Sequence, residues 1–215
     1  MLNNLFKNGV SIYEDEADKL NQIGCGYDIV GDYETAVEFW ENAAQAGNAE
    51  AMYHLGVAYE YGYGVDEDEQ VALIWYKKAA DAGNTDAMAA IALHYSVDKN
   101  DEFTAFKWYK KAAAAGHVDS MSNLAYCYSL GKGVSEDDFE AFKWFKKAAN
   151  AGDASAMCNL ADAYEYGRGV QQDIQEAFKW YKKAVGCSRS NDVRFESRIE
   201  ELKSFLDEHY RKFLK

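Results

Sequence analysis

Histidine and cysteine are the residues of this chain best suited to catalysis or metal binding, but their spacing predicts neither. None of the four histidines has a second ligand at the short spacing that is typical of a metal site. The four cysteines do not recur as pairs, which predicts free thiols in a reducing compartment. We therefore expect no catalytic, metal-binding or cofactor-binding residue, while the sequence leaves open whether folding brings some of these groups together. They are His54, His94, His117, His209, Cys25, Cys127, Cys158 and Cys187.

Three glycine-rich segments raise the question of phosphate binding. The sequence Gly-x-Gly-Val occurs at residues 62–65, 131–134 and 167–170. A phosphate-binding loop follows a strand and opens a helix, whereas each of these segments follows one predicted helix and breaks it. We interpret them as turns in which glycine supplies the positive φ that ends a helix and reverses the chain.

The charge of the chain argues against several classes of partner. Its 215 residues include 36 acidic and 23 basic side chains, a net charge of −13. Such a charge repels nucleic-acid backbones and anionic membranes.

Residues 1–10 lack the apolar run of a secretion signal, and no stretch of about 20 apolar residues could span a membrane. We expect a cytoplasmic protein that binds neither nucleic acid nor membrane.

An aromatic pair that occurs five times predicts the helices that would position these groups. The first members lie 36, 33, 36 and 36 residues apart, a period typical of helical solenoids. Apolar residues at helical spacing from Ala51 and again from Ala72 predict two amphipathic helices in one repeat. Each repeat is therefore predicted to be a helical hairpin, with aromatic residues such as Trp75 between successive hairpins. The pairs are Phe39-Trp40, Trp75-Tyr76, Trp108-Tyr109, Trp144-Phe145 and Trp180-Tyr181.

The repeat closely resembles the Sel1-like repeat of the tetratricopeptide-repeat superfamily. The pattern A-M-x-x-L-G-x-A-Y-x-x-G-x-G-V, followed by A-x-x-W-Y-K-K-A-A-x-A-G, extends over residues 51–186 in four units. The resemblance implies an all-α fold, a right-handed α-α superhelix or solenoid. We predict five helical hairpins and a capping helix at the C-terminal end.

The predicted organisation is a single repeat domain over residues 1–215. It comprises an N-terminal segment with a tetratricopeptide-like hairpin (1–47), four Sel1-like repeats (48–186) and the capping helix (187–215). Two hairpins depart from the pattern, since the first has a shorter turn and the third is shorter than the other Sel1-like repeats. Ala87 and Ala105 are 18 positions apart, whereas the equivalent residues of the other three Sel1-like repeats are 21 apart. The residues missing there are those of the Gly-x-Gly turn, and we expect the local curvature to change at this point.

The resemblance also implies where a partner binds, because in this superfamily the first helix of each hairpin lines the concave face. Among the positions expected to point inward are four acidic residues and several tyrosines, and no lysine or arginine. This composition favours a protein or peptide partner that carries apolar and basic side chains. The predicted partner-binding residues are Asn21, Asp28, Tyr53, Val57, Glu60, Tyr61, Leu93, Ser122, Tyr126, Asp162, Glu165 and Tyr166.

Other interpretations of the same residues stay open. Acidic residues are expected on any exposed surface of so acidic a protein, and some of the tyrosines could instead pack between helices. The recurring lysines beside the aromatic pairs could form a basic ridge, although lysine near a helix C-terminus also stabilises the helix dipole. A small-molecule-binding protein or enzyme is the alternative function, since some secreted relatives with paired cysteines have been associated with β-lactams.

We expect Glu60 and Glu165 to be exposed, and Trp144→Ala to remove a buried aromatic at a cost of about 3–5 kcal/mol.

Overall fold

The structure is a computed structural model that describes residues 6–7, 10–97, 99–187, 199–202 and 204. The chain forms two compact units, Met1–Asp98 and Lys99–Lys215. The boundary falls in the shortened connection of the third hairpin. In the first unit the elements are β1 (Phe6–Lys7), β2 (Val10–Ser11), α1 (Ile12–Ile29), α2 (Tyr33–Gln45), α3 (Ala49–Tyr61), α4 (Glu69–Asp81) and α5 (Thr85–Val97). In the second unit they are α6 (Glu102–Ala114), α7 (Val118–Leu130), α8 (Asp138–Asn150), α9 (Ala154–Tyr166) and α10 (Ile174–Cys187).

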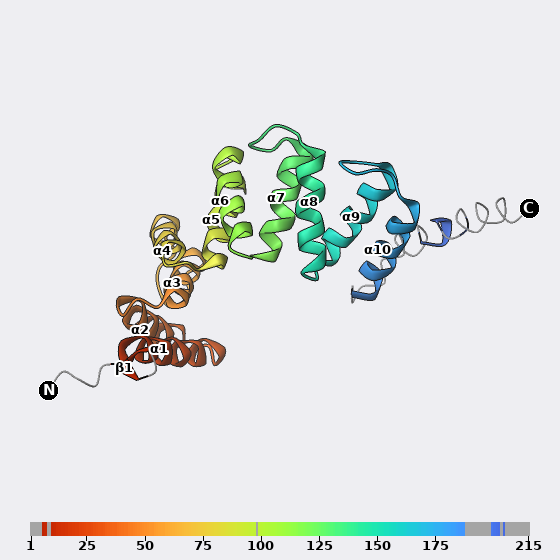
Figure 1. Ribbon diagram of the computed structural model, residues 1–215. Helices are drawn as coiled ribbons and strands as arrows, with labels where there is room; N and C mark the ends of the chain where they lie inside the picture. Colours follow the sequence, from red (N-terminus) through yellow and green to blue (C-terminus); the bar gives the residue numbers. More distant parts are fainter. Residues whose placement is uncertain (1–5, 8–9, 98, 188–198, 203, 205–215) are drawn as a thin grey trace, which may run out of the picture. The chain divides into compact units, whose positions relative to one another are not determined.

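Within each unit, consecutive helices pack against one another as hairpins (Figure 1). The pairs α1–α2 and α3–α4 stack in the first unit, and α7–α8 and α9–α10 in the second. The prediction of an all-α fold of stacked helical hairpins is confirmed. One small addition is the antiparallel pairing of β1 with β2 before α1, which the sequence did not suggest. Most of the predicted capping helix lies outside the described residues, but Ile199 and Leu202 pack against Ala161, Ala177 and Tyr181.

Acidic and amide side chains cap the N-termini of the helices. Asp68 and Asp137 accept hydrogen bonds from the first backbone amides of α4 and α8, and Asn48 does the same for α3. Helices of 13 residues are marginally stable on their own, so these caps and the packing between helices both matter. Some of the acidic residues that precede the second helices therefore serve to start those helices.

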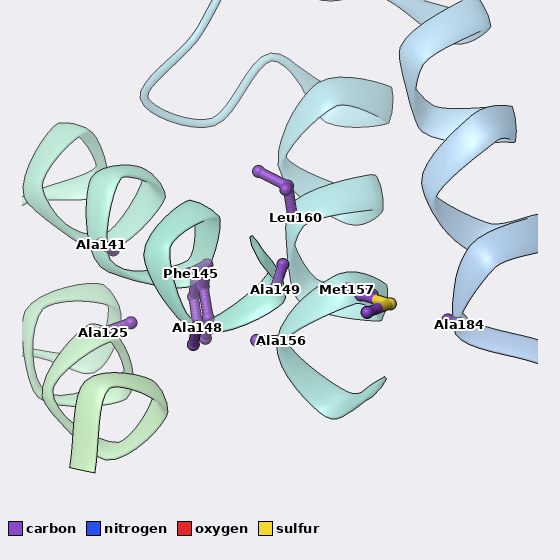
Figure 2. Packing of buried hydrophobic residues seen from close by; sticks show 9 residues of the cluster. All are labelled: Ala125, Ala141, Phe145, Ala148, Ala149, Ala156, Met157, Leu160 and Ala184. Carbon is purple, nitrogen blue, oxygen red and sulfur yellow. The ribbon is translucent and has the colours of Figure 1, made fainter. Parts of the chain in front are cut away.

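The core is built from small residues on the first helices and aromatic rings on the second. A Cβ atom added at Gly56 would lie 2.5 Å from the ring of Tyr76, and one at Gly24 would lie 2.7 Å from Trp40. Alanine and leucine fill the remaining space. In the second unit one such cluster joins α7, α8, α9 and α10 around Phe145 (Figure 2). The absence of a side chain on the glycine is what lets the aromatic ring lie against the facing helix.

The two members of each aromatic pair differ in burial, and the expectation that Trp144 is buried was wrong. The second member is buried in all five pairs: Trp40, Tyr76, Tyr109, Phe145 and Tyr181. Trp75, Trp108, Trp144 and Trp180 are only half-buried, and each is covered by the ammonium group of the lysine three positions later. The distances from nitrogen to ring centroid are 3.9, 4.1, 3.8 and 4.7 Å. These lysines therefore have a local role as cation–π partners.

The two glycines of each Gly-x-Gly turn have separate tasks. Gly62, Gly131 and Gly167 are left-handed and end the first helix, as predicted. Gly64, Gly133 and Gly169 are left-handed as well, and they also lie against the first turn of the second helix in the preceding hairpin. A Cβ atom added at Gly133 would be 2.1 Å from the carbonyl oxygen of Glu102, and one at Gly169 would be 2.0 Å from that of Asp138. The second glycine therefore allows two hairpins to meet backbone to backbone.

The two tasks can be separated by paired substitutions in the second unit. Gly131→Ala adds only the strain of a left-handed alanine, because the nearest atoms to the new Cβ lie 3.6 Å away, and it should cost about 1–2 kcal/mol. Gly133→Ala adds the clash with the Glu102 carbonyl to the same strain and should cost about 2–5 kcal/mol. Urea unfolding of both variants measures the difference. Equal losses would show that the close approach is unimportant.

A second pair of variants tests which aromatic residue supports the core. Phe145→Ala removes a buried ring from the cluster in Figure 2 and should cost about 3–5 kcal/mol. Trp144→Ala removes a half-buried ring with its lysine contact and should cost about 1–2 kcal/mol. Thermal unfolding would give the order, and a larger loss for Trp144→Ala would contradict the assignment.

Candidate interaction surface

The predicted partner-binding residues divide into three groups by exposure. The exposed ones are Asp28, Tyr61, Leu93, Tyr126 and Tyr166. The half-buried ones are Tyr53, Val57, Glu60 and Asp162. The buried ones are Asn21, Ser122 and Glu165. The exposed group is therefore the part of the predicted surface that a partner could reach directly.

Asn21 and Ser122 occupy equivalent positions and bond to the next hairpin, which corrects their placement on an open surface. The Asn21 Nδ2 atom donates to Glu50 Oε2 at 3.0 Å, from α1 to α3. The Ser122 hydroxyl donates to Asp153, which also caps α9. Both side chains thus hold consecutive hairpins together.

Glu165 was expected to be exposed, and this expectation was wrong: only 4% of the residue is accessible. The Tyr181 hydroxyl donates to Asp162 and lies 3.1 Å from Glu165 Oε2. In the first unit, the Tyr76 hydroxyl likewise donates to Glu60, which is half-buried. These acids accept hydrogen bonds from the hydroxyl groups of buried tyrosines. A buried hydroxyl without a hydrogen-bond partner would lower the stability of the fold.

The same contacts fix the protonation of the two tyrosines. Burial and the hydrogen bond to Glu60 raise the pKa of Tyr76 well above its ordinary value. Burial and the hydrogen bond to Asp162 do the same for the pKa of Tyr181. Both hydroxyls therefore remain protonated donors at neutral pH.

Exposed aromatic rings gather at the turn between α3 and α4. Tyr63, in the centre of the Gly-x-Gly turn, stacks on Tyr33 at 5.1 Å and on Tyr61 at 5.8 Å between ring centroids. Tyr61 is 58% exposed, and Leu93 on α5 is 56% exposed. In the second unit Tyr126 is held more firmly, because Asn159 Nδ2 donates to its hydroxyl at 2.7 Å and its ring lies edge-on to Phe145.

Folding does bring one cysteine and one histidine together in the first unit. Cys25 Sγ lies 3.5 Å from His54 Nε2, and His54 also stacks on Trp40. Burial is the main cause of the shifts at both groups: it raises the pKa of the Cys25 thiol and lowers the pKa of His54. Both shifts favour the neutral forms, whereas a nucleophilic cysteine needs a thiolate stabilised by a charged imidazole. The pair therefore lacks the electrostatics of an activated nucleophile.

A cleft of about 430 Å³ lies between α3, α4 and α5. Glu60, Tyr61, Leu73, Tyr76 and Ala90 form part of its wall. Glu67, Glu69 and His94 complete its polar lining, and His94 Nδ1 lies 3.3 Å from Glu69 Oε1. None of these last three residues is among the predicted partner-binding residues, although His94 was one of the histidines considered for catalysis or metal binding. The signal available was a histidine at a position that glycine, alanine or cysteine occupies in the other repeats.

Comparison with known proteins gives the family. A family model of the Sel1 repeat matches residues 24–48, 49–84, 85–117, 118–153 and 154–185. The chain belongs to the Sel1 repeat family. The first hairpin, which resembled a tetratricopeptide repeat in its turn, is among the matched segments.

Solved structures support the same assignment. The crystal structure of a Sel1 repeat protein from Oxalobacter formigenes is 31% identical, with a TM-score of 0.74 over 83% of this chain and 75% of that one. The antigen c5321 of uropathogenic Escherichia coli, described as displaying an SLR fold, is 29% identical, with a TM-score of 0.67 over 79% of this chain. This chain spans 37% of c5321. No curated protein matches the chain.

Sel1 repeat proteins generally mediate contacts between proteins and typically act as non-catalytic scaffolds. Within the described residues, no three histidine, cysteine or acidic side chains are arranged to hold a metal ion. In the same part of the chain, no helix has the length and apolar character needed to cross a bilayer.

The burial of Glu165 leads to a prediction about charge reversal in this Sel1 repeat protein. Glu165→Lys places a cation in the buried site beside Tyr181 and removes an acceptor, so it should destabilise the second unit by about 3–5 kcal/mol. Asp28→Lys, at an exposed position of α1, should change stability by less than about 0.5 kcal/mol. Circular dichroism during urea unfolding compares the two variants. A wild-type midpoint for Glu165→Lys would contradict the structural role given to this residue.

Proposed function

We propose that this Sel1 repeat protein is a cytoplasmic, non-catalytic scaffold or adaptor that binds a segment of a protein partner carrying apolar and basic side chains. The partner lies on the exposed face of the first helices. The observation that carries the proposal is the exposure of Tyr61 and Leu93, two large apolar residues on α3 and α5 of the same unit. Aromatic and aliphatic side chains of this kind are the usual anchors of protein interfaces.

Charge supports the basic character of the partner. Asp28 is exposed on α1, and Glu60, Glu67 and Glu69 border the cleft beside α3 and α4. Carboxylates around an apolar contact favour a cationic partner and disfavour an acidic one. The buried acid Glu165 is excluded from this surface, since Tyr181 already donates toward it.

The chemistry of the thiols supports the proposed location in the cytoplasm. Cys25 and Cys127 are free thiols. Burial raises the pKa of Cys127 to about 11, so this thiol stays protonated and unreactive. Free thiols are typical of reducing compartments, which supports the cytoplasm.

Selection from a displayed peptide library tests the proposal and does not require the partner to be identified first. The immobilised full chain should enrich peptides with aromatic or aliphatic residues next to arginine or lysine. Tyr61→Ala and Leu93→Ala should each weaken binding of a selected peptide about fivefold or more, because each removes an exposed anchor.

Ile74→Ala provides the matched control. Ile74 is an exposed aliphatic residue of similar size in the same unit, but it lies on the second helix α4. Its substitution should leave peptide affinity unchanged in fluorescence anisotropy. The proposal fails if no peptide is enriched, or if Ile74→Ala weakens binding as much as the changes at Tyr61 and Leu93.

A further inference from the structure

The charge of the chain is divided unevenly between its two units. Residues 1–98 contain 18 acidic and 4 basic residues, a net charge of −14. Residues 99–215 contain 18 acidic and 19 basic residues, a net charge of +1. The second unit therefore differs from the first in the kind of partner that its surface attracts.

Lysines recur on the exposed side of the second helices in the second unit. On α6, the exposed residues Phe103, Lys107 and Lys110 lie at positions i, i+4 and i+7, which is one side of a helix. The helix α8 repeats this arrangement in the next hairpin. The two helices occupy equivalent places in consecutive hairpins, with α7 packed between them, so both stripes belong to the same side of the unit (Figure 1). We call these six residues the Phe–Lys surface: Phe103, Lys107, Lys110, Phe139, Lys143 and Lys146.

The packing of the repeat does not require these residue types. The equivalent positions of α2 hold Glu34, Glu38 and Glu41, and α2 packs against α1 and α3 all the same. Stabilisation of the helix dipole does not explain the lysines either, since that effect is confined to the last turn. The lysines in the last turns of α6 and α8 are Lys111 and Lys147, which are not part of the Phe–Lys surface.

The two phenylalanines are large apolar residues on a charged surface. Phe103 is 59% exposed and Phe139 is 57% exposed. The Lys107 ammonium group lies 3.9 Å from the ring centroid of Phe103, and the Lys143 group lies 4.3 Å from that of Phe139. An ammonium group that covers a ring still has N–H donors for a second contact. Each stripe therefore offers an apolar ring and cationic groups to the same partner.

Acidic residues neutralise the Phe–Lys surface only in part. Within the described residues, Lys143 is the member of the surface that forms an ion pair, to Glu140 Oε1 at 2.6 Å on the same helix. On α6 the place of that acid is taken by Thr104. Asp101, which caps α6, interacts with Lys107 at longer range. The surface therefore keeps a net positive charge that a partner can meet.

We propose that the Phe–Lys surface binds an acidic segment of a protein partner that also carries aliphatic or aromatic side chains. The proposal goes beyond the proposed function, because it gives the scaffold a second surface, in its other unit, for a partner of opposite charge. Carboxylates of the segment pair with Lys107, Lys110 and Lys146, and its apolar side chains contact the two phenylalanines. Helices that pack directly lie about 8–10 Å apart, so α6 and α8 are at most about 20 Å apart, roughly six residues of extended chain.

A second copy of this chain is another source of an acidic stripe. Its Glu34, Glu38 and Glu41 complement the lysines in charge, but these three residues offer no apolar side chain to the phenylalanines. Such a contact would also join unlike surfaces of two copies, which builds rings or open chains rather than a symmetric dimer. The match of both charge and apolar character therefore favours a different protein.

Binding of a designed peptide tests the surface. The probe is a fluorescein-labelled peptide that repeats Glu-Glu-Leu four times, and its binding to the full chain is followed by fluorescence anisotropy. It should bind saturably, and at least about threefold more weakly at about 200 mM salt than at about 50 mM. Matched peptides that repeat Gln-Gln-Leu or Glu-Glu-Ser should each bind at least about threefold more weakly. Equal binding of either matched peptide, or no saturable binding, would overturn the proposal.

Two double variants with the same change in net charge locate the binding site. Lys110→Gln combined with Lys146→Gln removes one lysine from each stripe and should weaken peptide binding about threefold to tenfold. Lys77→Gln combined with Lys78→Gln removes the same charge from α4 in the first unit and should leave the affinity unchanged. All four lysines are exposed, so both variants should keep the thermal midpoint of the unchanged chain. Equal losses of affinity in the two variants would contradict the assignment.

Two further measurements identify a different occupant. Sedimentation of the chain alone should show no association that Lys110→Gln with Lys146→Gln abolishes, and such an association would assign the surface to a second copy. A duplex DNA oligonucleotide that binds these lysines more tightly than the peptide would assign it to nucleic acid. Either result overturns the proposal. Tyr61→Ala and Leu93→Ala change the other unit and should not affect the acidic peptide, so this proposal and the proposed function can fail separately.

Discussion

The contact on which the stack depends is an aromatic ring of the second helix lying against a small residue of the first. Gly24 and Gly56 leave space for Trp40 and Tyr76, and a single added carbon at either glycine would overlap the ring. This close approach leaves only 4% of Trp40 and of Tyr76 exposed, so their polar atoms are largely removed from solvent. Where the residue is a tyrosine, the facing helix must therefore supply an acceptor.

The need for an acceptor explains the presence of carboxylates that the composition of the predicted concave face would assign to partner binding. Tyr76 and Tyr181 are buried donors, and Glu60 and Glu165 occupy the equivalent position on their facing helices. Phe145 has no hydroxyl, and Ser129 stands at that position in its hairpin. In the hairpins of Tyr76 and Tyr181 the acid therefore has the role of a structural acceptor. Asp68 and Asp137 serve a different local need, the capping of α4 and α8. Some of the carboxylates that contribute to the net charge of −13 are thus engaged within the fold and do not face a partner.

The sequence was enough to predict the helical hairpins, because helix periodicity, turn glycines and a repeat length near 36 all agree within each unit. It did not show which member of each aromatic pair is buried. Neighbouring positions on a helix point about 100° apart, and hydrophobicity alone favours tryptophan. The choice is made by the glycine or alanine on the facing helix. Similarly, the sequence identified acids at inward positions, but only the folded chain shows that Glu165 is already engaged by Tyr181.

The interruption of the repeat at the third hairpin illustrates a different limit, since it was visible in the sequence but the role of the missing segment was not. The loss of the Gly-x-Gly segment from the third hairpin could be counted directly, and it predicted a local irregularity. What that segment does for its neighbour became visible only where Gly133 and Gly169 meet the preceding helices and where Lys132 reaches Glu102. The third hairpin has no Gly-x-Gly segment and therefore cannot make this glycine contact. In a regular array, such an interruption is therefore a physically reasoned place to look for the contact that distinguishes one Sel1 repeat protein from another.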